Sequence, residues 1–147
     1  MNNNKTLSYD ISPERYNKIL SGIQLLSIDL MSISAERAED WTDIADPCLQ
    51  HFENHSYKQI DRNNIIVKSG YSISIIDKDN PEMIACTVKM VLRSKIFTKD
   101  KFTKAFFQVF SQLNLPVNVW PYVRTYTQFF TANMGLPSVT LPYRKNI

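Results

Sequence analysis

Residues 67–92 of the chain read VKSGYSISIIDKDNPEMIACTVKMVL. Between Val67 and Ile75, most of the alternate positions are apolar, and the same holds between Ile84 and Leu92. Such a period of two is typical of β-strands, whose successive side chains point to opposite faces of a sheet. The middle of the stretch contains Asp, Lys, Asp, Asn and Pro in a row, which favour turns. The pattern therefore predicts two long antiparallel strands joined by a polar turn.

The segment before this hairpin begins with a helix signal. Ser12 can cap a helix, Pro13 suits its first turn, and the acidic residue that follows lies at the positive end of the helix dipole. These residues predict a short helix over residues 13–21, ended by Gly22. Residues 23–35 are rich in strand-forming residues, but their alternation changes phase, which predicts a strand with a bulge or one that uses both faces.

Residues 36–64 have no clear period. Acidic residues crowd the first part, Pro47 interrupts any helix, and residues 57–61 have the composition of a strand. We therefore expect an irregular segment that contains one short strand or helix.

The last third of the chain changes to the period of a helix. Apolar residues recur at i, i+4, i+7, i+8 and i+11 from Phe102 onwards, which predicts a helix over residues 100–113. Thr98 is a candidate cap for this helix. A break is expected at residues 114–116, because Pro116 follows two residues without helical periodicity.

A second helix is expected to begin near Asn118. This residue can cap the helix, and Pro121 then lies in the first turn, where its missing N–H costs nothing. A wide apolar stripe continues to Met134, and Gly135 is expected to end the helix in a left-handed conformation.

The order of these elements indicates the fold class. Strands followed by helices, without βαβ alternation, are typical of an α+β fold. We predict an antiparallel sheet covered on one face by the two C-terminal helices, with a short N-terminal helix. The length of 147 residues fits one domain, which we assign to residues 11–147. Residues 1–10 are polar and Asn-rich, and we expect them to be a disordered leader.

The composition argues against several classes of function. A net charge of +3 from dispersed basic residues does not predict nucleic-acid binding. Three glycines leave no phosphate-binding loop and two cysteines no disulfide framework, so we expect a cytoplasmic protein without a cofactor. The sequence has neither a signal peptide nor about 18 consecutive apolar residues, which argues against membrane insertion. We interpret the densest basic cluster as solvated surface; it comprises Arg93, Lys95, Lys99, Lys101 and Lys104.

One group of residues has metal-ligand chemistry. Cys48, His51 and His55 are spaced i, i+3 and i+7, so on a helix they would share a face and could bind zinc. Only three ligands are present, and the residues around them match no zinc-enzyme motif. We therefore predict no metal and no catalytic residue, and keep a zinc-dependent hydrolase as a third hypothesis.

Aromatic residues concentrate in the two C-terminal helices. Four of them form the adjacent pairs Phe106–Phe107 and Phe129–Phe130, and neighbours on a helix point about 100° apart. One member of each pair is therefore expected to make a second contact, with another subunit or a bound apolar ligand. The candidate binding or interface residues are Phe106, Phe107, Phe110, Trp120, Tyr122, Tyr126, Phe129 and Phe130.

Two motifs in this region resemble the SecB family of export chaperones. Residues 118–124 read NVWPYVR, which is similar to the run that opens the long helix of that family. Residues 134–137 read MGLP and are followed by Leu141 and Pro142, which resembles the segment after that helix. The resemblance extends more loosely over residues 12–34 and 65–92 and over the helix from Phe102.

The resemblance implies a fold and an activity. It implies a four-stranded antiparallel sheet, packed helices, and a homotetramer that is a dimer of dimers. The implied activity is that of an ATP-independent holdase, whose unfolded preprotein clients bind in apolar grooves. General members of the family dock the SecA motor through carboxylates on the sheet, so the resemblance also names SecA as a candidate partner.

This chain departs from the general members of the family. It is basic, and its best strands present mostly Ser, Thr and Lys outward. Residues 143–145 read YRK, where the family continues with apolar residues. These departures favour a specialised SecB-like protein that protects a dedicated partner, such as the antitoxin of a toxin-antitoxin system. The first hypothesis is therefore a SecB-like chaperone; the second is a module that binds a small apolar ligand between helix and sheet.

Overall fold

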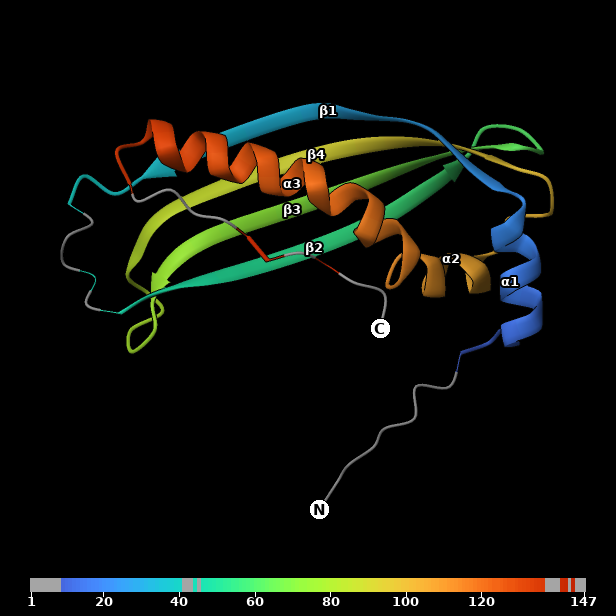
Figure 1. Cartoon of the computed structure of the whole chain (residues 1–147), viewed down its shortest axis with the longest axis horizontal. Coiled ribbons are helices and arrows are strands. Elements are labelled where there is room, and N and C mark those ends of the chain that lie inside the picture. The colour runs from blue at the N-terminus through green and yellow to red at the C-terminus, as the bar shows by residue number, and fades with distance from the viewer. Residues whose placement is uncertain (1–8, 41–43, 45, 137–140, 143, 145–147) are drawn as a thin grey trace, which may run out of the picture.

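The computed structural model describes residues 9–40, 44, 46–136, 141, 142 and 144 of the chain. Four strands form one sheet, and the helices lie together on one of its faces (Figure 1). The elements in chain order are α1 (Pro13–Ser21), β1 (Ile23–Arg37), β2 (Pro47–Gln59), β3 (Asn64–Asp77), β4 (Ile84–Thr98), α2 (Lys104–Phe110) and α3 (Asn114–Asn133). Of the expected leader, only residues 9 and 10 are described.

The sheet has the strand order β1-β4-β3-β2, and every neighbouring pair is antiparallel. The predicted α+β fold is thereby confirmed, with four strands, a short N-terminal helix and two C-terminal helices. The predicted hairpin is formed by β3 and β4, in which Tyr71 lies opposite Met90 and Ile73 opposite Val88. Strands β1 and β2 are the edges of the sheet.

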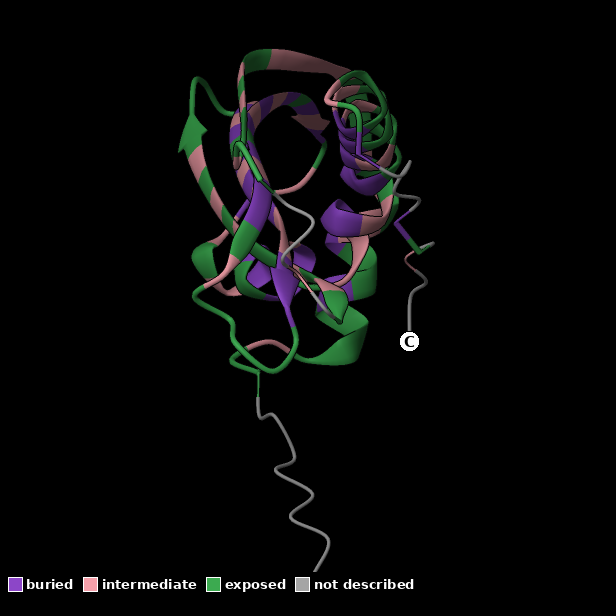
Figure 2. Cartoon of the chain, turned by 90° about the vertical axis from the view of Figure 1, so that its left-hand side faces the viewer, coloured by how far each residue is buried: buried purple, intermediate pink, exposed green. Residues whose placement is uncertain are grey.

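The core lies between the sheet and the helices (Figure 2). The predicted apolar phase of the hairpin points into it, and Val67, Val88 and Leu92 are completely buried. On the helix side, Phe106 and Val119 are equally buried. Burying one such side chain contributes about 1.5–3 kcal/mol, so this layer interface supplies most of the driving force for the fold.

Strand β1 contains two bulges, which explains its change of phase. Its register against β4 shifts between Leu25 and Ser27 and again between Leu30 and Ser32. The residue that each shift skips is apolar and exposed: the exposed fractions of Leu26 and Met31 are 53% and 48%. A bulge leaves its extra residue outside the ladder, which places these two side chains at the surface.

The expectation of an irregular segment over residues 36–64 is wrong for most of that range. Strand β2 is 13 residues long and pairs with β3 along its whole length, from Pro47 opposite Asp77 to Gln59 opposite Ile65. The strand shows no apolar alternation because its core-side positions carry the polar residues His51, Glu53 and His55, and no residue in it is fully buried.

The helix boundaries also differ from the prediction. The cap of α2 is Thr103, whose Oγ1 accepts a hydrogen bond of 3.1 Å from the Phe106 N–H, whereas Thr98 ends β4. Helix α3 begins at Asn114, so the predicted break there is absent and Asn118 lies inside the helix. Pro121 therefore lies in the helix interior, on an exposed side, and not in the first turn.

The outer ends of the helical segments are as predicted. The Ser12 hydroxyl accepts a hydrogen bond of 3.2 Å from the Arg15 N–H and caps α1. Gly135 follows α3 with a φ of +72°, a conformation that glycine adopts without steric cost. No helix in the described part of the chain is long and apolar enough to cross a membrane.

Candidate client-binding surface

Half of the candidate aromatic residues lie in the protein core. The exposed fractions of Phe106, Phe107, Phe110 and Trp120 are 0%, 8%, 4% and 3%. Tyr16 of α1 stacks on Phe106, with ring centroids 5.0 Å apart. Phe107 instead contacts Tyr57 of β2, with centroids 4.5 Å apart. The second contact expected of this adjacent pair is therefore made within the chain.

The other half lies on one side of α3. Tyr122, Tyr126, Phe129 and Phe130 are spaced i, i+4, i+7 and i+8, which places them on a common side of the helix. Tyr126 and Phe130 are half-buried and pack against the core. Tyr122 and Phe129 are exposed by 40% and 61%, and the Phe129 ring stands edge-on to Phe130 at 5.5 Å. Of the second pair, Phe129 is thus the member left free within the chain.

The opposite side of α3 faces the C-terminal segment. The indole N–H of Trp120 donates a 2.6 Å hydrogen bond to the carbonyl oxygen of Pro142. The Nε of Arg124 donates a 2.8 Å bond to the carbonyl oxygen of Leu141. The aromatic side of α3 consequently faces away from this segment.

A cavity shows what the aromatic side of α3 faces instead. Asn118, one turn before Tyr122, lines a cavity of about 230 Å3 together with Ile23 and Leu25 of β1. Further along, Arg37 near the end of β1 donates a 2.5 Å hydrogen bond to the carbonyl oxygen of Met134. Helix α3 therefore passes alongside the edge strand β1, as Figure 1 also shows.

We call the surface between these two elements the apolar seam. Its β1 members are Leu25, Ile28, Leu30 and Ile33, of which the last three are half-buried against the core. Its α3 members are Tyr122, Tyr126, Phe129 and Phe130. The exposed bulge residues of β1 lie on the same edge strand. The sequence prediction missed all the β1 members, although the change of phase in β1 marked a strand with unusual exposure.

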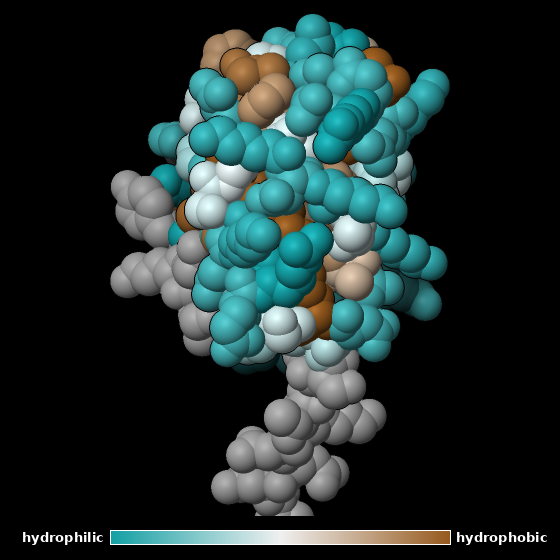
Figure 3. All heavy atoms as spheres, turned by 90° about the vertical axis from the view of Figure 1, so that its right-hand side faces the viewer, coloured by the Kyte–Doolittle hydropathy of each residue, from teal (hydrophilic) through white to brown (hydrophobic). Residues whose placement is uncertain are grey.

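The end of the molecule that carries α1 has a different character. Figure 3 shows this end as mostly hydrophilic, with separate apolar patches. Lys99 and Lys101, which belong to the densest basic cluster of the sequence, are exposed in the connection between β4 and α2. These observations fit the interpretation of the cluster as solvated surface.

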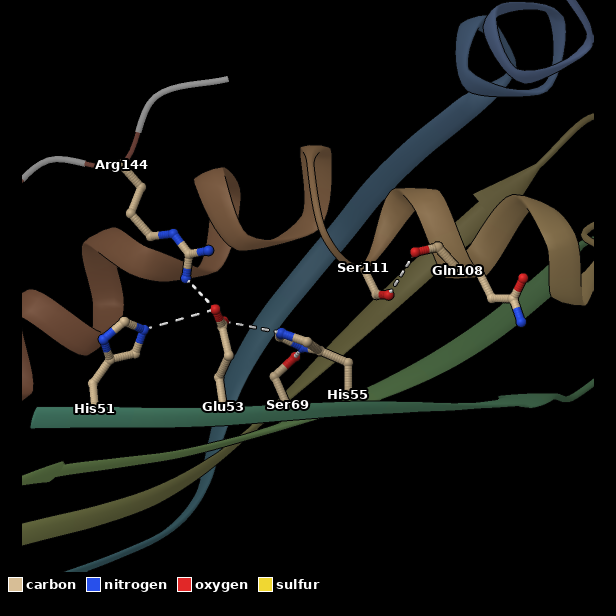
Figure 4. A network of polar contacts seen from close by, with 7 residues as sticks. All are labelled: His51, Glu53, His55, Ser69, Gln108, Ser111 and Arg144. Carbon is tan, nitrogen blue, oxygen red and sulfur yellow. Dashed lines mark hydrogen bonds and ion pairs between the residues drawn. The ribbon is translucent and has the colours of Figure 1, made fainter. Parts of the chain in front are cut away.

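A polar cluster lies on the helix side of strand β2. His51, Glu53 and His55 occupy alternate positions of β2 and point to the same side, and Arg144 of the C-terminal segment points toward them (Figure 4). One Glu53 oxygen lies 2.6 Å from the Arg144 guanidinium, and the other lies 3.1 Å from His55 Nε2. His55 Nδ1 lies 2.7 Å from the Ser69 hydroxyl. We call these five residues the Glu53 cluster.

The surroundings shift the pKa of two groups here. Burial alone would raise the pKa of the Glu53 carboxyl, but hydrogen bonds from His55 and Arg144 and the charge of Arg144 outweigh it and lower this pKa to about 2. The pKa of the Tyr71 hydroxyl is raised, first by burial and then by the charge of Glu53. Glu53 is therefore a stable anion that fixes the C-terminal segment to the sheet.

Strand geometry separates the residues of the zinc hypothesis. Cys48 and His51 have opposite parity on β2, so their side chains point to opposite faces of the sheet. The three residues could share one face only if this segment were a helix. Among the described residues, no three His, Cys, Asp or Glu side chains are grouped so that they could hold a metal ion.

Comparison with known proteins shows a likeness of fold. No protein-family model and no curated protein matches the sequence. The fold matches the structure of the Mycobacterium tuberculosis Rv1957 SecB-like chaperone in complex with a ChAD peptide from the Rv1956 HigA1 antitoxin. The TM-score is 0.71 at 16% sequence identity, over 90% of this chain and 99% of that one. A protein of unknown function from Streptococcus agalactiae matches with a TM-score of 0.44, at 10% identity over 82% of this chain and 97% of that one.

Proposed function

We propose that this chain, whose fold is that of a SecB-like chaperone, is itself an ATP-independent chaperone that holds unfolded client segments on an apolar surface. One observation carries the proposal: nearly the whole of a SecB-like chaperone, solved with a peptide from an antitoxin, superposes on this chain. We further propose a dedicated client of the antitoxin kind, and residence in the cytoplasm.

The apolar seam is the proposed client-binding surface. It exposes two aromatic rings, Tyr122 and Phe129, which no element of the described chain covers. Removing one exposed aromatic side chain from water contributes about 2 kcal/mol, without any demand on the sequence of the partner. A few such contacts along an extended client give useful affinity with little specificity. Part of the seam would join subunits if the chain assembles into the proposed homotetramer.

The proposed function does not include docking of SecA, which general members of the family bind through carboxylates on the sheet. The face of the sheet turned away from the helices carries Lys68, Lys89 and Lys95, which are exposed. A basic face does not complement a partner selected by carboxylates. Delivery to the export motor is therefore not part of the proposed function.

An aggregation assay tests the proposal. The full chain should suppress aggregation of a chemically unfolded protein at a near-stoichiometric ratio without ATP. The double substitution Tyr122→Ser and Phe129→Ser should raise the amount of chaperone needed by at least about tenfold, because the two lost contacts together exceed the roughly 1.4 kcal/mol that corresponds to about tenfold in affinity. The control is Gln128→Ser, which changes an exposed polar residue of the same helix. Failure to protect any of several unfolded proteins would disprove the holdase activity. Full activity of the double variant would show that the apolar seam is not the client-binding surface.

A module for a small apolar ligand is the second candidate, and the cavity between α1, β1 and α3 favours it. The apolar side chains around this cavity include Leu20, Ile23, Leu25, Phe110 and Leu115. Its volume of about 230 Å3 lies below the usual range of ligand pockets, about 300–1,000 Å3, so the chaperone is the better supported function. Native mass spectrometry decides: a constant added mass that denaturing conditions release would favour the ligand module, and a bare chain would reject it.

A further inference from the structure

The face of the sheet turned away from the helices has a hollow at its centre. It measures about 390 Å3 and draws residues from all four strands. We call it the outer hollow and define it by Ser34, Phe52, Asn54, Gly70, Ser72 and Lys89. These six residues alternate with the core-facing ones along their strands, so their side chains point away from the helices and the apolar seam.

Gly70 makes the floor of the hollow. In the sheet it lies between Asn54 of β2 and Val91 of β4. A Cβ atom at this position would lie only 2.6 Å from Asn54 Oδ1, so the amide of Asn54 already occupies the space of a side chain. Any larger residue at position 70 would therefore displace Asn54, so glycine is what allows the Asn54 amide to lie over the centre of this face.

One row of cross-strand neighbours forms the wall. The pairing places Phe52 beside Ser72, Ser72 beside Lys89, and Lys89 beside Ser34. An aromatic ring, a hydroxyl, an ammonium group and a second hydroxyl thus follow one another across the sheet. Phe52 is exposed by 64%, more than any other large apolar residue in the described part of the chain. Because it points away from the core, its ring is available to a partner on this face of the sheet.

Of the residues that line the hollow, Lys89 and Glu53 carry charge, and the Glu53 carboxylate is bound by Arg144 and His55 on the helix side of the sheet. By strand alternation, this face also carries Lys58, Lys68, Arg93 and Lys95, against the acids Asp29 and Glu36. Arg93 pairs with Asp29 at 3.5 Å, which uses one charge of each sign. The remaining lysines are exposed, so the face has an excess of positive charge next to an exposed aromatic ring.

We propose that the outer hollow docks an extended acidic segment of a partner protein. A carboxylate of the partner would bind Lys89 between the hydroxyls of Ser34 and Ser72, and an apolar side chain would lie against Phe52. Charge complementarity argues for this occupant, and Phe52 supplies the anchor that a purely electrostatic contact lacks. A protein is favoured over nucleic acid because Asp29 and Glu36 interrupt the positive charge, which forms no continuous basic stripe.

The direct test is binding of a labelled peptide to the full chain, measured by fluorescence anisotropy. The probe is a ten-residue peptide of alternating Glu and Leu; the comparison peptide has Gln in place of Glu. The acidic peptide should bind at least about tenfold more tightly than the neutral one and weaken steeply with added salt. Lys89→Glu and Phe52→Ser should each lower its affinity by about tenfold. Lys104→Glu is the control, because it reverses an exposed charge on α2, on the other side of the sheet.

Several outcomes would overturn the proposal. They are equal binding of both peptides, no binding of either, and full affinity of the Lys89→Glu chain. Tighter binding of a single-stranded oligonucleotide with the same dependence on Lys89 would replace the protein partner with nucleic acid. The proposal is independent of the holdase: Lys89→Glu should leave aggregation suppression unchanged, and a loss of that activity would contradict two separate surfaces.

Discussion

The Glu53 carboxylate joins two parts of the chain that are far apart in sequence. One of its oxygens contacts Arg144, 91 residues away, and the other contacts His55 on the same strand. The cluster is polar but largely shielded: the Glu53 side chain is exposed by only 21%. A shielded carboxylate with charged partners stabilises the fold only while it is ionised. This residue should therefore give the protein a specific response to acid.

Replacing Glu53 with Gln should destabilise the chain in a pH-dependent manner. The pKa of Glu53 is about 2 in the folded chain, against 4.5 for an ordinary glutamate. Its stabilisation is therefore complete above about pH 4.5 and is lost as the pH falls towards 2. At pH 7 the variant should lose about 2–3 kcal/mol of unfolding free energy, and the difference should shrink between pH 4.5 and 2. Urea unfolding at several pH values measures this.

The matched control is Glu82→Gln, which removes an exposed carboxylate in the turn between β3 and β4. It should change the unfolding free energy by less than about 0.5 kcal/mol at every pH. A Glu53→Gln variant whose deficit is the same at pH 7 and pH 2.5 would show that packing, and not the ionised carboxylate, is what Glu53 contributes.

Among the elements, those with local signals could be predicted from the sequence. The cap at Ser12 identifies α1, and the strict alternation from Val67 to Leu92 identifies the β3–β4 hairpin. Strand β2 could not be predicted, because its core-side positions carry His51, Glu53 and His55. Their partner Arg144 and the covering indole of Trp120 come from much later in the chain. A period-based argument cannot anticipate polar residues whose partners are supplied over such a distance.

The candidate site shows the same limit. The predicted wide apolar stripe includes Tyr122, Tyr126, Phe129 and Phe130, which the helix carries on one side, since such placement depends on local geometry alone. The fate of Phe106 and Phe107 depended on α1 and on Tyr57, which cover them from two directions. Which aromatic residues stay exposed is decided by tertiary contacts, and these are not encoded in the spacing.

At the scale of the whole molecule, a group of exposed apolar residues lies along one edge of the sheet. Leu25, Leu26 and Met31 all belong to β1, which is an edge strand, and the aromatic side of α3 lies along the same strand. An edge with unpaired backbone groups and exposed apolar side chains readily pairs with another copy. Charged residues or proline at these three positions would hinder pairing with another copy, but the positions carry apolar residues instead.

We therefore expect the chain to assemble through β1. Light scattering coupled to size exclusion should give a mass near 68 kDa, four times the 17.1 kDa of one chain, for the proposed homotetramer. Leu26→Lys and Met31→Lys together should reduce this mass, because two buried ammonium groups at a subunit contact are costly, while the chain still folds since both residues are exposed in it. Phe52→Ser, which removes a still more exposed apolar residue from the outer face, should leave the mass unchanged. A wild-type chain that is monomeric at all concentrations would rule out the tetramer and leave the whole β1 edge free for clients.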